Sequence, residues 1–369
     1  MRPYLTEHFG NASSVHALGR KAKVALEDAR GRVAAALNCE PAEIIFTGGG
    51  TEADNAAIKG VLGASEKKGL VTSAAEHEAV LRTAEVLADD GGEVDVLKPE
   101  AQGAVSVEHV AEAITPDTGL VSIMLVNNEV GTISPVREIA DITHEQGALM
   151  HTDAVQAAGM LSLDVEELGV DLLSLSGHKI NGPKGVGVLY VRAGTPLAPQ
   201  ITGGAQEQKR RGGTENVAAI VGFAEALERA NNARQENSER LRVLQKRLAE
   251  GIQDAFGDSV QFNTPLDGFH PDPQTVTPHI LNVSFPPVSG HAIDGEMLLL
   301  GLDVAGVYVS GGSACASGAI EPSHVLLAMG VPPETSVATV RYSLGTSTSA
   351  DDVDFAVEQT KAVVRRMIT

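Results

Sequence analysis

Short apolar runs alternate with helical patterns from residue 43 to residue 192, and this alternation restricts the possible folds more than any other feature of the chain. The apolar runs are EIIFT, LVTSA, EVDVL, LVSIMLV, ALMHTDA, LLSLS and GVGVLYVR. Residues 120–126 form an unbroken apolar run, which is typical of a strand buried on both faces of a mostly parallel sheet. We therefore expect an α/β fold whose central sheet is covered by helices on both sides.

A helical stretch over residues 216–256, weakly broken near Asn231, connects this region to a sequence of different character. The next residues contain four prolines that indicate loops, namely Pro265, Pro271, Pro273 and Pro278. Beyond them, ILNVSF, GVYVS and ATVRYSL predict strands, and AIDGEMLLL, HVLLAMG and DDVDFAVEQTKAVVRRM predict helices. We predict a large domain over residues 1–237 and a smaller α+β domain over residues 238–369.

Composition excludes several classes of function. The chain has 369 residues and a net charge of −20, and its only dense basic run is residues 209–211, so it does not resemble a nucleic-acid-binding protein. No apolar stretch approaches the roughly 18 residues of a membrane helix, and the first ten residues lack the pattern of a secretory signal. We therefore expect a cytoplasmic protein that binds no membrane. Two cysteines, Cys39 and Cys315, are too few for a disulfide framework.

The turn Gly48-Gly49-Gly50-Thr51 lies between a predicted strand and a predicted helix. Backbone amides and the positive end of the helix can hold a phosphate there, and Thr51 adds a hydroxyl donor. Three glycines also suit a plain tight turn, and neither the dinucleotide nor the nucleoside-triphosphate glycine pattern is present. The candidate ligand is therefore a phosphate monoester of another kind of molecule.

A carboxylate and an amine are expected at one edge of the sheet. Asp153 ends the run ALMHTDA, and Lys179 follows the run LLSLS. Parallel strands place their carboxyl ends on the same edge, where α/β proteins bind ligands. Pyridoxal phosphate needs a lysine that forms an imine and a carboxylate that faces its pyridine nitrogen. An ordinary surface lysine is the alternative for Lys179.

Two further polar residues follow strands of the same sheet. His77 suits stacking on a cofactor ring and moving protons at the substrate's α-carbon, or alternatively capping a helix or lying in the core. Asn128 suits donation to the cofactor's phenolic oxygen or to a substrate carboxylate, or alternatively forming a turn.

The second half of the chain offers a thiol and a guanidinium. Cys315 lies among small residues, in SGGSACASG, which is typical of a mobile loop where a thiol is accessible as a nucleophile. Cys39 follows a helix and is read as structural or incidental. Arg341 lies inside an apolar strand, where an incoming carboxylate or an internal ion pair would be its partner.

Taken together, these residues closely resemble the cysteine desulfurases of the IscS and NifS type. Those are pyridoxal-phosphate enzymes of the class V aminotransferase group, with the fold-type I architecture. The resemblance runs from HFGNASS at residues 8–14 to the final helix. It rests on an ordered set of residues and motifs, namely His77, Asn128, Asp153, Gln156, SGHK at 176–179, RRGGTEN at 210–216, SAC at 313–315 and Arg341.

The resemblance implies a role for each matching residue. Lys179 would form the imine, Asp153 would face the pyridine nitrogen, and His77 would stack on the ring. Thr214 would reach the phosphate of a second subunit, which implies a homodimer. The residues implied to contact the cofactor are Thr51, His77, Asn128, Asp153, Gln156, Ser176, His178, Lys179 and Thr214.

The resemblance also implies the reaction. Arg341 and Asn128 would bind the carboxylate of L-cysteine, and Cys315 would take the substrate's sulfur as a persulfide, leaving L-alanine. An iron-sulfur scaffold or another protein would accept the sulfur. No resident metal is predicted, although Cys315 could ligate a transferred iron-sulfur cluster. A selenocysteine lyase, a related class V lyase or aminotransferase, or an inactive paralogue are the alternatives.

Two departures from the family pattern stand out. Family members usually begin with a further strand and an Asn-Ala-Thr-Thr-Pro type segment, whereas this chain starts at MRPY, in the helix that normally follows. The entrance to the site is therefore expected to be incomplete. The family commonly has serine and alanine where this chain has Gly48 and Gly50, which loosens the phosphate turn.

Overall fold

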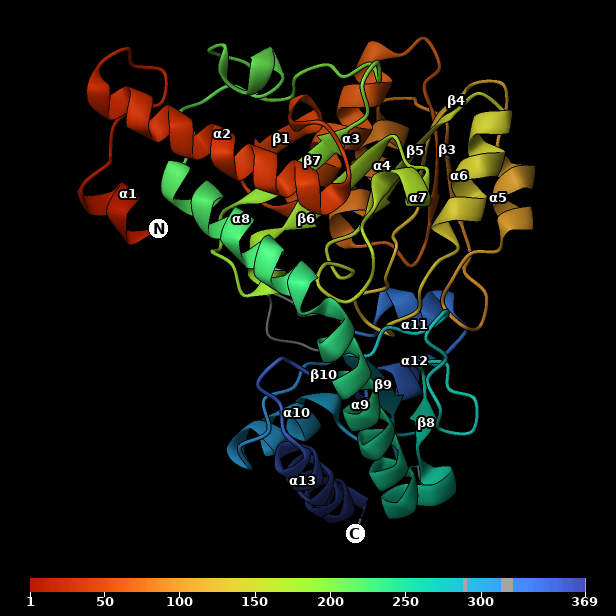
Figure 1. Cartoon of the computed structure of the whole chain (residues 1–369). Coiled ribbons are helices and arrows are strands. Elements are labelled where there is room, and N and C mark those ends of the chain that lie inside the picture. The colour runs from red at the N-terminus through yellow and green to blue at the C-terminus, as the bar shows by residue number, and fades with distance from the viewer. Residues whose placement is uncertain (288–290, 313–320, 369) are drawn as a thin grey trace. The chain divides into compact units, whose positions relative to one another are not determined.

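The computed structural model of the chain describes residues 1–287, 291–312 and 321–368 (Figure 1). Its backbone contacts define two compact units. The large unit comprises Met1–Leu97, Ser106–Leu125 and Pro135–Arg234, and the small unit comprises Lys98–Val105, Val126–Ser134 and Gln235–Thr369. The domain boundary expected after residue 237 stays a prediction.

The large unit is built on a seven-stranded sheet in the order β1-β7-β6-β5-β4-β2-β3. Only β7 runs antiparallel to its two neighbours, and the remaining adjacent pairs are parallel. The α/β fold with a mostly parallel sheet is thus confirmed. The strands are β1 (Ile44–Thr47), β2 (Gly69–Ser73), β3 (Val94–Leu97), β4 (Thr118–Ser122), β5 (Leu149–Asp153), β6 (Leu172–Ser176) and β7 (Gly187–Val191).

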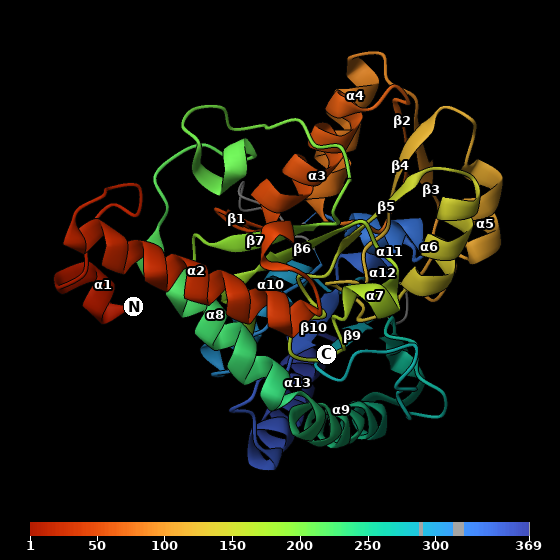
Figure 2. The same ribbon diagram turned by 45° about the horizontal axis from the view of Figure 1, so that its top comes forward.

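Helices cover both faces of this sheet. In Figure 2, α3 and α4 lie above the sheet while α2 and α8 lie side by side below it. Ala53, Ala57, Ile58 and Val61 form one apolar stripe of α3 and pack on strand residues such as Leu120. The helices of this unit are α1 (Arg2–Thr6), α2 (Ala17–Leu37), α3 (Gly50–Ala64), α4 (Glu78–Asp89), α5 (Val107–Ala113), α6 (Val136–Glu145), α7 (Val165–Leu168) and α8 (Val217–Asn232).

The small unit contains a three-stranded antiparallel sheet in the order β10-β9-β8. Its strands are β8 (Gln261–Phe262), β9 (Ile280–Ser284) and β10 (Thr339–Ser343). Its helices are α9 (Arg234–Phe256), α10 (Gly295–Val304), α11 (His324–Ala328), α12 (Pro333–Ser336) and α13 (Ala350–Ile368). Arg247 on α9 forms an ion pair with Asp354 on α13, with 2.6 Å between Nη2 and Oδ2.

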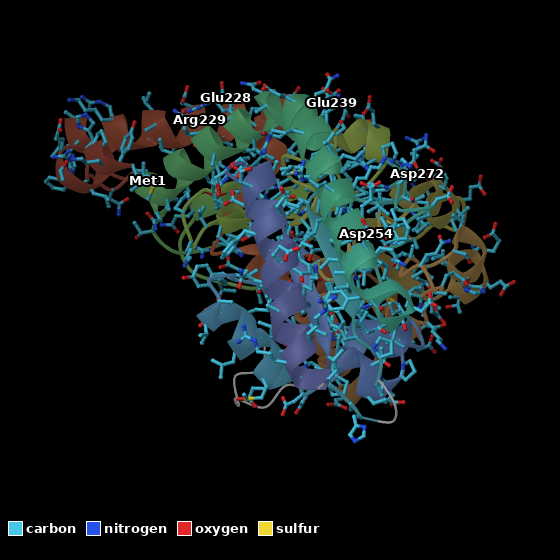
Figure 3. The ribbon with its side chains drawn as sticks, turned by 90° about the horizontal axis from the view of Figure 1, so that it is seen from below. Met1, Glu228, Arg229, Glu239, Asp254 and Asp272 are labelled. Carbon is cyan, nitrogen blue, oxygen red and sulfur yellow. The ribbon has the colours of Figure 1, made fainter. Side chains whose placement is uncertain are left out.

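The long helical stretch expected over residues 216–256 consists of two helices. Its break lies at Ala233, two residues after the predicted position, and separates α8 from α9. Figure 3 labels Arg229 near the end of α8 and Glu239 in the first half of α9, on either side of this break.

Two predicted strands differ from the structure. The strand expected at 306–310 is reduced to one isolated bridge between Ser310 and Arg341. The strand expected over 120–126 ends at Ser122, because the neighbouring β2 ends at Ser73 and only β5 continues to accept hydrogen bonds from residues 123 and 125. In the part of the chain that the structure describes, no helix is long and apolar enough to cross a membrane.

Candidate active site

Polar residues of the large unit follow the carboxyl ends of three parallel strands. β5 ends at Asp153, β6 is followed by a 3-10 turn that carries Lys179, and β2 is followed by His77 at the start of α4. Parallel strands place these ends on one edge of the sheet, where α/β proteins bind ligands. The structure therefore brings together the acid, the amine and the imidazole on which the cofactor hypothesis rests.

Asp153 is 6% exposed, and its Oδ1 accepts a hydrogen bond of 2.8 Å from the amide of Val155. Burial raises the pKa of this carboxyl, while the Val155 amide and the charges of His77 and Lys179 favour its ionised form. A positive group placed beside Asp153 would stabilise the carboxylate further. This environment fits a pyridine nitrogen that must stay protonated.

His77 is the N-cap residue of α4. Its Nδ1 accepts a hydrogen bond of 3.1 Å from the amide of Ala79, while the side chain remains exposed. The capping alternative is therefore realised, and it fixes the ring with Nδ1 as the acceptor. A neutral ring then carries its proton on Nε2, so capping and proton transfer through Nε2 are compatible.

A phosphate-binding turn lies at the start of α3. The helix begins at Gly50, so the amides of its first turn have no acceptor within the helix, and Thr51 is exposed there. A Cβ added to Gly50 would lie 2.9 Å from Cγ2 of Val155 and 3.5 Å from Cβ of Ser176. The turn therefore lies against the end of β6, and an alanine at position 50 would require Val155 to shift.

Ser176 and His178 form a hydrogen bond at this end of β6, with 2.9 Å between Oγ and Nδ1. Burial lowers the pKa of His178, and the charges of Lys179 and Lys184 lower it further. The ring is thus held toward its neutral form, in which it can still donate one hydrogen bond. Gln156 is half-buried, three residues after Asp153.

Thr214 is exposed in the loop that follows a 3-10 turn at Gln206–Lys209. Arg211 of this loop pairs with Glu52 on α3, with 2.8 Å between Nε and Oε1, and Glu207 pairs with the buried Arg30. The backbone of this turn is strained, because Glu207, Gln208 and Lys209 have positive φ values of 43°, 57° and 68°. The two ion pairs must offset that strain. The role of Thr214 toward a second subunit stays a prediction.

We expect Arg30→Ala to lower the free energy of unfolding by about 3–5 kcal/mol, because the Glu207 carboxylate would remain buried without its partner. Arg30 is 5% exposed and forms two 2.8 Å hydrogen bonds to Glu207 and one to the carbonyl of Ile44. Urea unfolding measures the change. Adding Glu207→Gln to Arg30→Ala should recover part of the loss.

The matched control is Arg32→Ala. This arginine pairs with Glu225 and Glu228, but its side chain is 29% exposed and both glutamates are about half exposed. Water screens such pairs, so we expect a loss of about 0–1 kcal/mol. Equal losses for Arg30→Ala and Arg32→Ala would contradict the larger stabilising effect expected of the buried pair between Arg30 and Glu207.

The small unit brings Arg341 and Asn128 together. Nη1 of Arg341 donates to the carbonyl oxygen of Asn128 at 2.8 Å, and Nε donates to Oγ of Ser310 at 3.1 Å. Burial lowers the pKa of Arg341, which the charge of Glu129 opposes. Among the described residues, Oδ1 of Asn128 is buried without a hydrogen-bond partner. A cation and an unsatisfied amide oxygen thus lie together. The cation suits an incoming carboxylate, and the oxygen suits an amine or hydroxyl that can donate to it.

Only one of the two cysteines lies in the described part of the chain. Cys315 lies outside the described residues, so its predicted role as nucleophile stays a prediction. Cys39 is a half-buried free thiol whose pKa is raised by burial to about 12, with Glu43 and Glu40 adding to the shift. A thiol with so high a pKa is not a nucleophile near neutral pH, which agrees with its structural reading.

Three buried titratable groups lie near Asp153 that the sequence pattern did not indicate as candidates. They are Asp54 on α3, Glu76 before α4, and His151 on β5. Nδ1 of His151 lies 2.8 Å from Oγ of Ser122, and its Nε2 lies 3.8 Å from Oδ1 of Asp54. Burial raises the pKa of Asp54 and of Glu76, and the charge of Asp153 adds to both shifts. The spacing of His151 and Asp153, two apart on one strand face, was the available signal.

We expect His151→Asn to flatten the loss of stability at acidic pH. Burial lowers the pKa of His151 to about 3, whereas an unfolded histidine takes up its proton near pH 6.5. The unfolded chain therefore binds the proton first, so this group's stabilisation is lost as the pH falls below about 6.5, by about 1 kcal/mol per pH unit. Unfolding free energies between about pH 6 and pH 4 measure the slope. His144→Asn, at a partly exposed site, is the control, and an unchanged slope in His151→Asn would contradict the prediction.

The chain is similar to known proteins over nearly its whole length. The aminotransferase class-V family matches residues 1–355. A relative named cysteine desulfurase IscS from Clostridium botulinum is 45% identical, over 99% of this chain and 90% of that protein. A second from Methanosarcina thermophila, with the same name, is also 45% identical, over 100% of this chain and 88% of that protein. A solved NifS-like protein superposes with a TM-score of 0.89 at 35% identity, covering 99% of this chain and 94% of that chain.

These matches extend over both units, and the solved structure shares the fold over nearly the full length of each chain. The fold is therefore that of the fold-type I enzymes, which bind pyridoxal phosphate. The chain belongs to the class-V aminotransferase family, among the cysteine desulfurases.

Proposed function

We propose that this chain is a pyridoxal-phosphate-dependent cysteine desulfurase, which converts L-cysteine to L-alanine and keeps the sulfur as a persulfide on Cys315. The observation that carries the proposal is the buried carboxylate of Asp153, which interacts with Lys179 and His77 at the carboxyl edge of the sheet. A buried acid beside two basic groups is what the cofactor requires. The relatives named cysteine desulfurase support the same activity.

The residues of the large unit fit the cofactor. Lys179 is exposed at the end of β6 and would carry the cofactor, while Asp153 would face its pyridine nitrogen. The free amides at the start of α3 would hold the phosphate together with Thr51, Ser176 and His178. When bound, pyridoxal phosphate withdraws electrons from the substrate's α-carbon. Gln156 would donate to its phenolic oxygen, and so would Asn128, which belongs to the small unit.

His77 and Arg341 would act on the substrate. The exposed ring of His77 would stack on the cofactor and move a proton through Nε2, because its Nδ1 already caps α4. Arg341 would bind the substrate carboxylate, since its hydrogen bonds to Asn128 and Ser310 use Nη1 and Nε and, among the residues that the structure describes, leave Nη2 available. Asn128 would assist through its side-chain amide.

Cys315 would attack the sulfur of the substrate. The bond between the substrate's Cβ and its sulfur breaks, a sulfur–sulfur bond to Cys315 forms, and Cβ takes up a proton to give alanine. The transferred sulfur is thereby oxidised and the carbon reduced, so no external redox agent is needed. A thiol or an acceptor protein then releases the persulfide sulfur, and an iron-sulfur scaffold is the acceptor we propose.

We also propose a cytoplasmic homodimer. The first 24 residues carry four large apolar side chains that are between 64% and 87% exposed, namely Leu5, Phe9, Val15 and Val24. So many exposed apolar side chains within a short stretch of chain favour an interaction surface there, and a second copy of the chain would cover them. Thr214 would then reach the phosphate of the other subunit. The net charge of −20 favours a sulfur acceptor with a basic surface.

The test is to incubate the purified protein with L-cysteine and a thiol reductant and to measure alanine and sulfide together. Equal yields are expected, and Cys315→Ala should abolish both products while the cofactor's colour stays. Cys39→Ala is the matched control and should keep full activity. Alanine formation that survives Cys315→Ala would contradict the persulfide step. If the protein turned over selenocysteine faster than L-cysteine, and Cys315→Ala kept that activity, the result would favour a selenocysteine lyase.

A further inference from the structure

Three consecutive backbone carbonyls in the small unit each accept a hydrogen bond from a different side chain. Arg341 donates to the carbonyl of Asn128 at 2.8 Å, Asn282 donates through Nδ2 to that of Glu129 at 3.0 Å, and Thr264 donates through Oγ1 to that of Val130 at 2.8 Å. The donors come from β10, from β9 and from the loop before β9. Side chains of the small sheet thus fix the segment 128–130 through its backbone.

Asn282 lies at the centre of this arrangement and is 0% exposed. The side-chain Oδ1 of Asn282 accepts a 2.7 Å hydrogen bond from Nδ2 of Asn263, and the backbone N–H of Asn282 donates to Oγ1 of Thr264 at 2.9 Å. Since Asn263 presents the donor Nδ2, the side-chain amide of Asn282 must turn its acceptor, Oδ1, toward Asn263. Its Nδ2 therefore has to point at the carbonyl of Glu129, which leaves the Asn282 side chain one orientation.

Asn282 and Arg341 are register partners on β9 and β10. Asn282 holds the segment 128–130, and the carbonyl of Asn128 in turn orients the guanidinium of Arg341, together with Oγ of Ser310. A guanidinium is a rigid planar fork, so two fixed hydrogen bonds determine the direction of the remaining N–H groups. Those groups are on Nη2 and on the second position of Nη1.

We infer that Asn282 is a positioning residue that sets the affinity for the substrate carboxylate, by holding the segment 128–130 against Arg341. The inference rests on the proposed function only in taking Arg341 as the carboxylate ligand. Asn282 does not touch the substrate. It fixes the carbonyl that aims the guanidinium, and it fixes Asn128, whose side-chain amide would share the same ligand.

The test compares Asn282→Ser with wild type in the cofactor-loaded enzyme. The shorter serine cannot reach both Asn263 and the carbonyl of Glu129. We expect the KM for L-cysteine to rise about tenfold, as the loss of one buried hydrogen bond implies, with kcat changed less than about threefold. The affinity for L-alanine, measured from the cofactor's absorbance, should fall by the same factor. The affinity for ethylamine, which is alanine without its carboxylate, should not change.

Thr339→Val is the matched control. Thr339 is 1% exposed on β10 and pairs with Oγ of Ser284 at 2.6 Å, in the same buried polar group, but within the described part of the chain it forms no hydrogen bond to residues 127–132. It should lower thermal stability as Asn282→Ser does and leave both affinities unchanged. Thr264→Val, which removes the hydrogen bond to Val130, is the second test variant and gives the same readout if Asn282→Ser does not fold.

The outcomes separate this inference from the proposed function. A protein that does not convert L-cysteine refutes the proposed activity, while the comparison of L-alanine with ethylamine still reports on the carboxylate. If Arg341→Lys weakens L-alanine binding but Asn282→Ser and Thr264→Val do not, Arg341 keeps its role and the inference on Asn282 is wrong. Equal weakening of L-alanine and ethylamine in Asn282→Ser would also overturn it, because it would indicate a general structural defect.

Discussion

Replacing Lys179 with alanine is expected to remove both the cofactor's absorbance at about 420 nm and all measurable turnover of L-cysteine. Lys179 follows β6 and interacts electrostatically with the buried Asp153, so it is the amine placed to hold the cofactor covalently. Loss of such a group costs at least about 10³-fold in rate, because no other residue supplies the bond. Absorbance spectra and alanine formation measure the two effects.

Lys184→Ala is the matched control for this result. Lys184 is exposed and lies five residues further along the chain, in the loop before β7, near enough to lower the pKa of His178. Its removal takes away one positive charge without removing the amine that follows β6. We expect unchanged colour and activity. Retained absorbance in Lys179→Ala, with loss in Lys184→Ala, would mean that the attachment residue is assigned wrongly.

Asp153→Asn is expected to lower kcat by about 10²–10³-fold while the protein stays coloured. The asparagine keeps an oxygen that can accept from the Val155 amide, but it has no charge with which to hold the pyridine nitrogen protonated. Lys179 remains, so the cofactor stays attached. The measurement is kcat for L-cysteine together with the absorbance spectrum.

When both proteins lack the cofactor, Asp153→Asn should be more stable than wild type. Burial raises the pKa of Asp153, so the folded protein holds a proton that the unfolded chain releases above about pH 3.9. Stability from this group is present below that pH and is lost as the pH rises through the folded-state pKa. Asparagine removes this loss at neutral pH, and urea unfolding of the apoprotein measures the gain.

Asp171→Asn is the control for both readouts. Asp171 is 5% exposed, but its carboxylate accepts from the amide of Met150 and pairs with His144 at 2.8 Å. We expect lower stability and an unchanged kcat. A similar fall of kcat in Asp171→Asn and Asp153→Asn would show that the effect follows from any buried charge change in the large unit.

Much of the large unit could be predicted from local sequence. The seven strands read from apolar runs are present, and the edge position of Asp153, Lys179 and His77 follows from strand direction alone. Strand ends were less predictable. Residues 123–126 are apolar because they are buried, yet the end of a strand depends on where its neighbour ends, which a local pattern does not contain.

The sequence by itself determined the α/β class, the candidate cofactor residues and the resemblance on which their roles depend, because periodicity and motif spacing are local properties. Only the tertiary structure decided which residues distant along the chain share a buried environment. Asp54, Glu76 and His151 beside Asp153 are one case, and Asn282 holding the carbonyl of Glu129, 153 positions away, is the other. Each side chain could have been satisfied by water or by a turn, and packing removes those options, leaving contacts that no local pattern encodes.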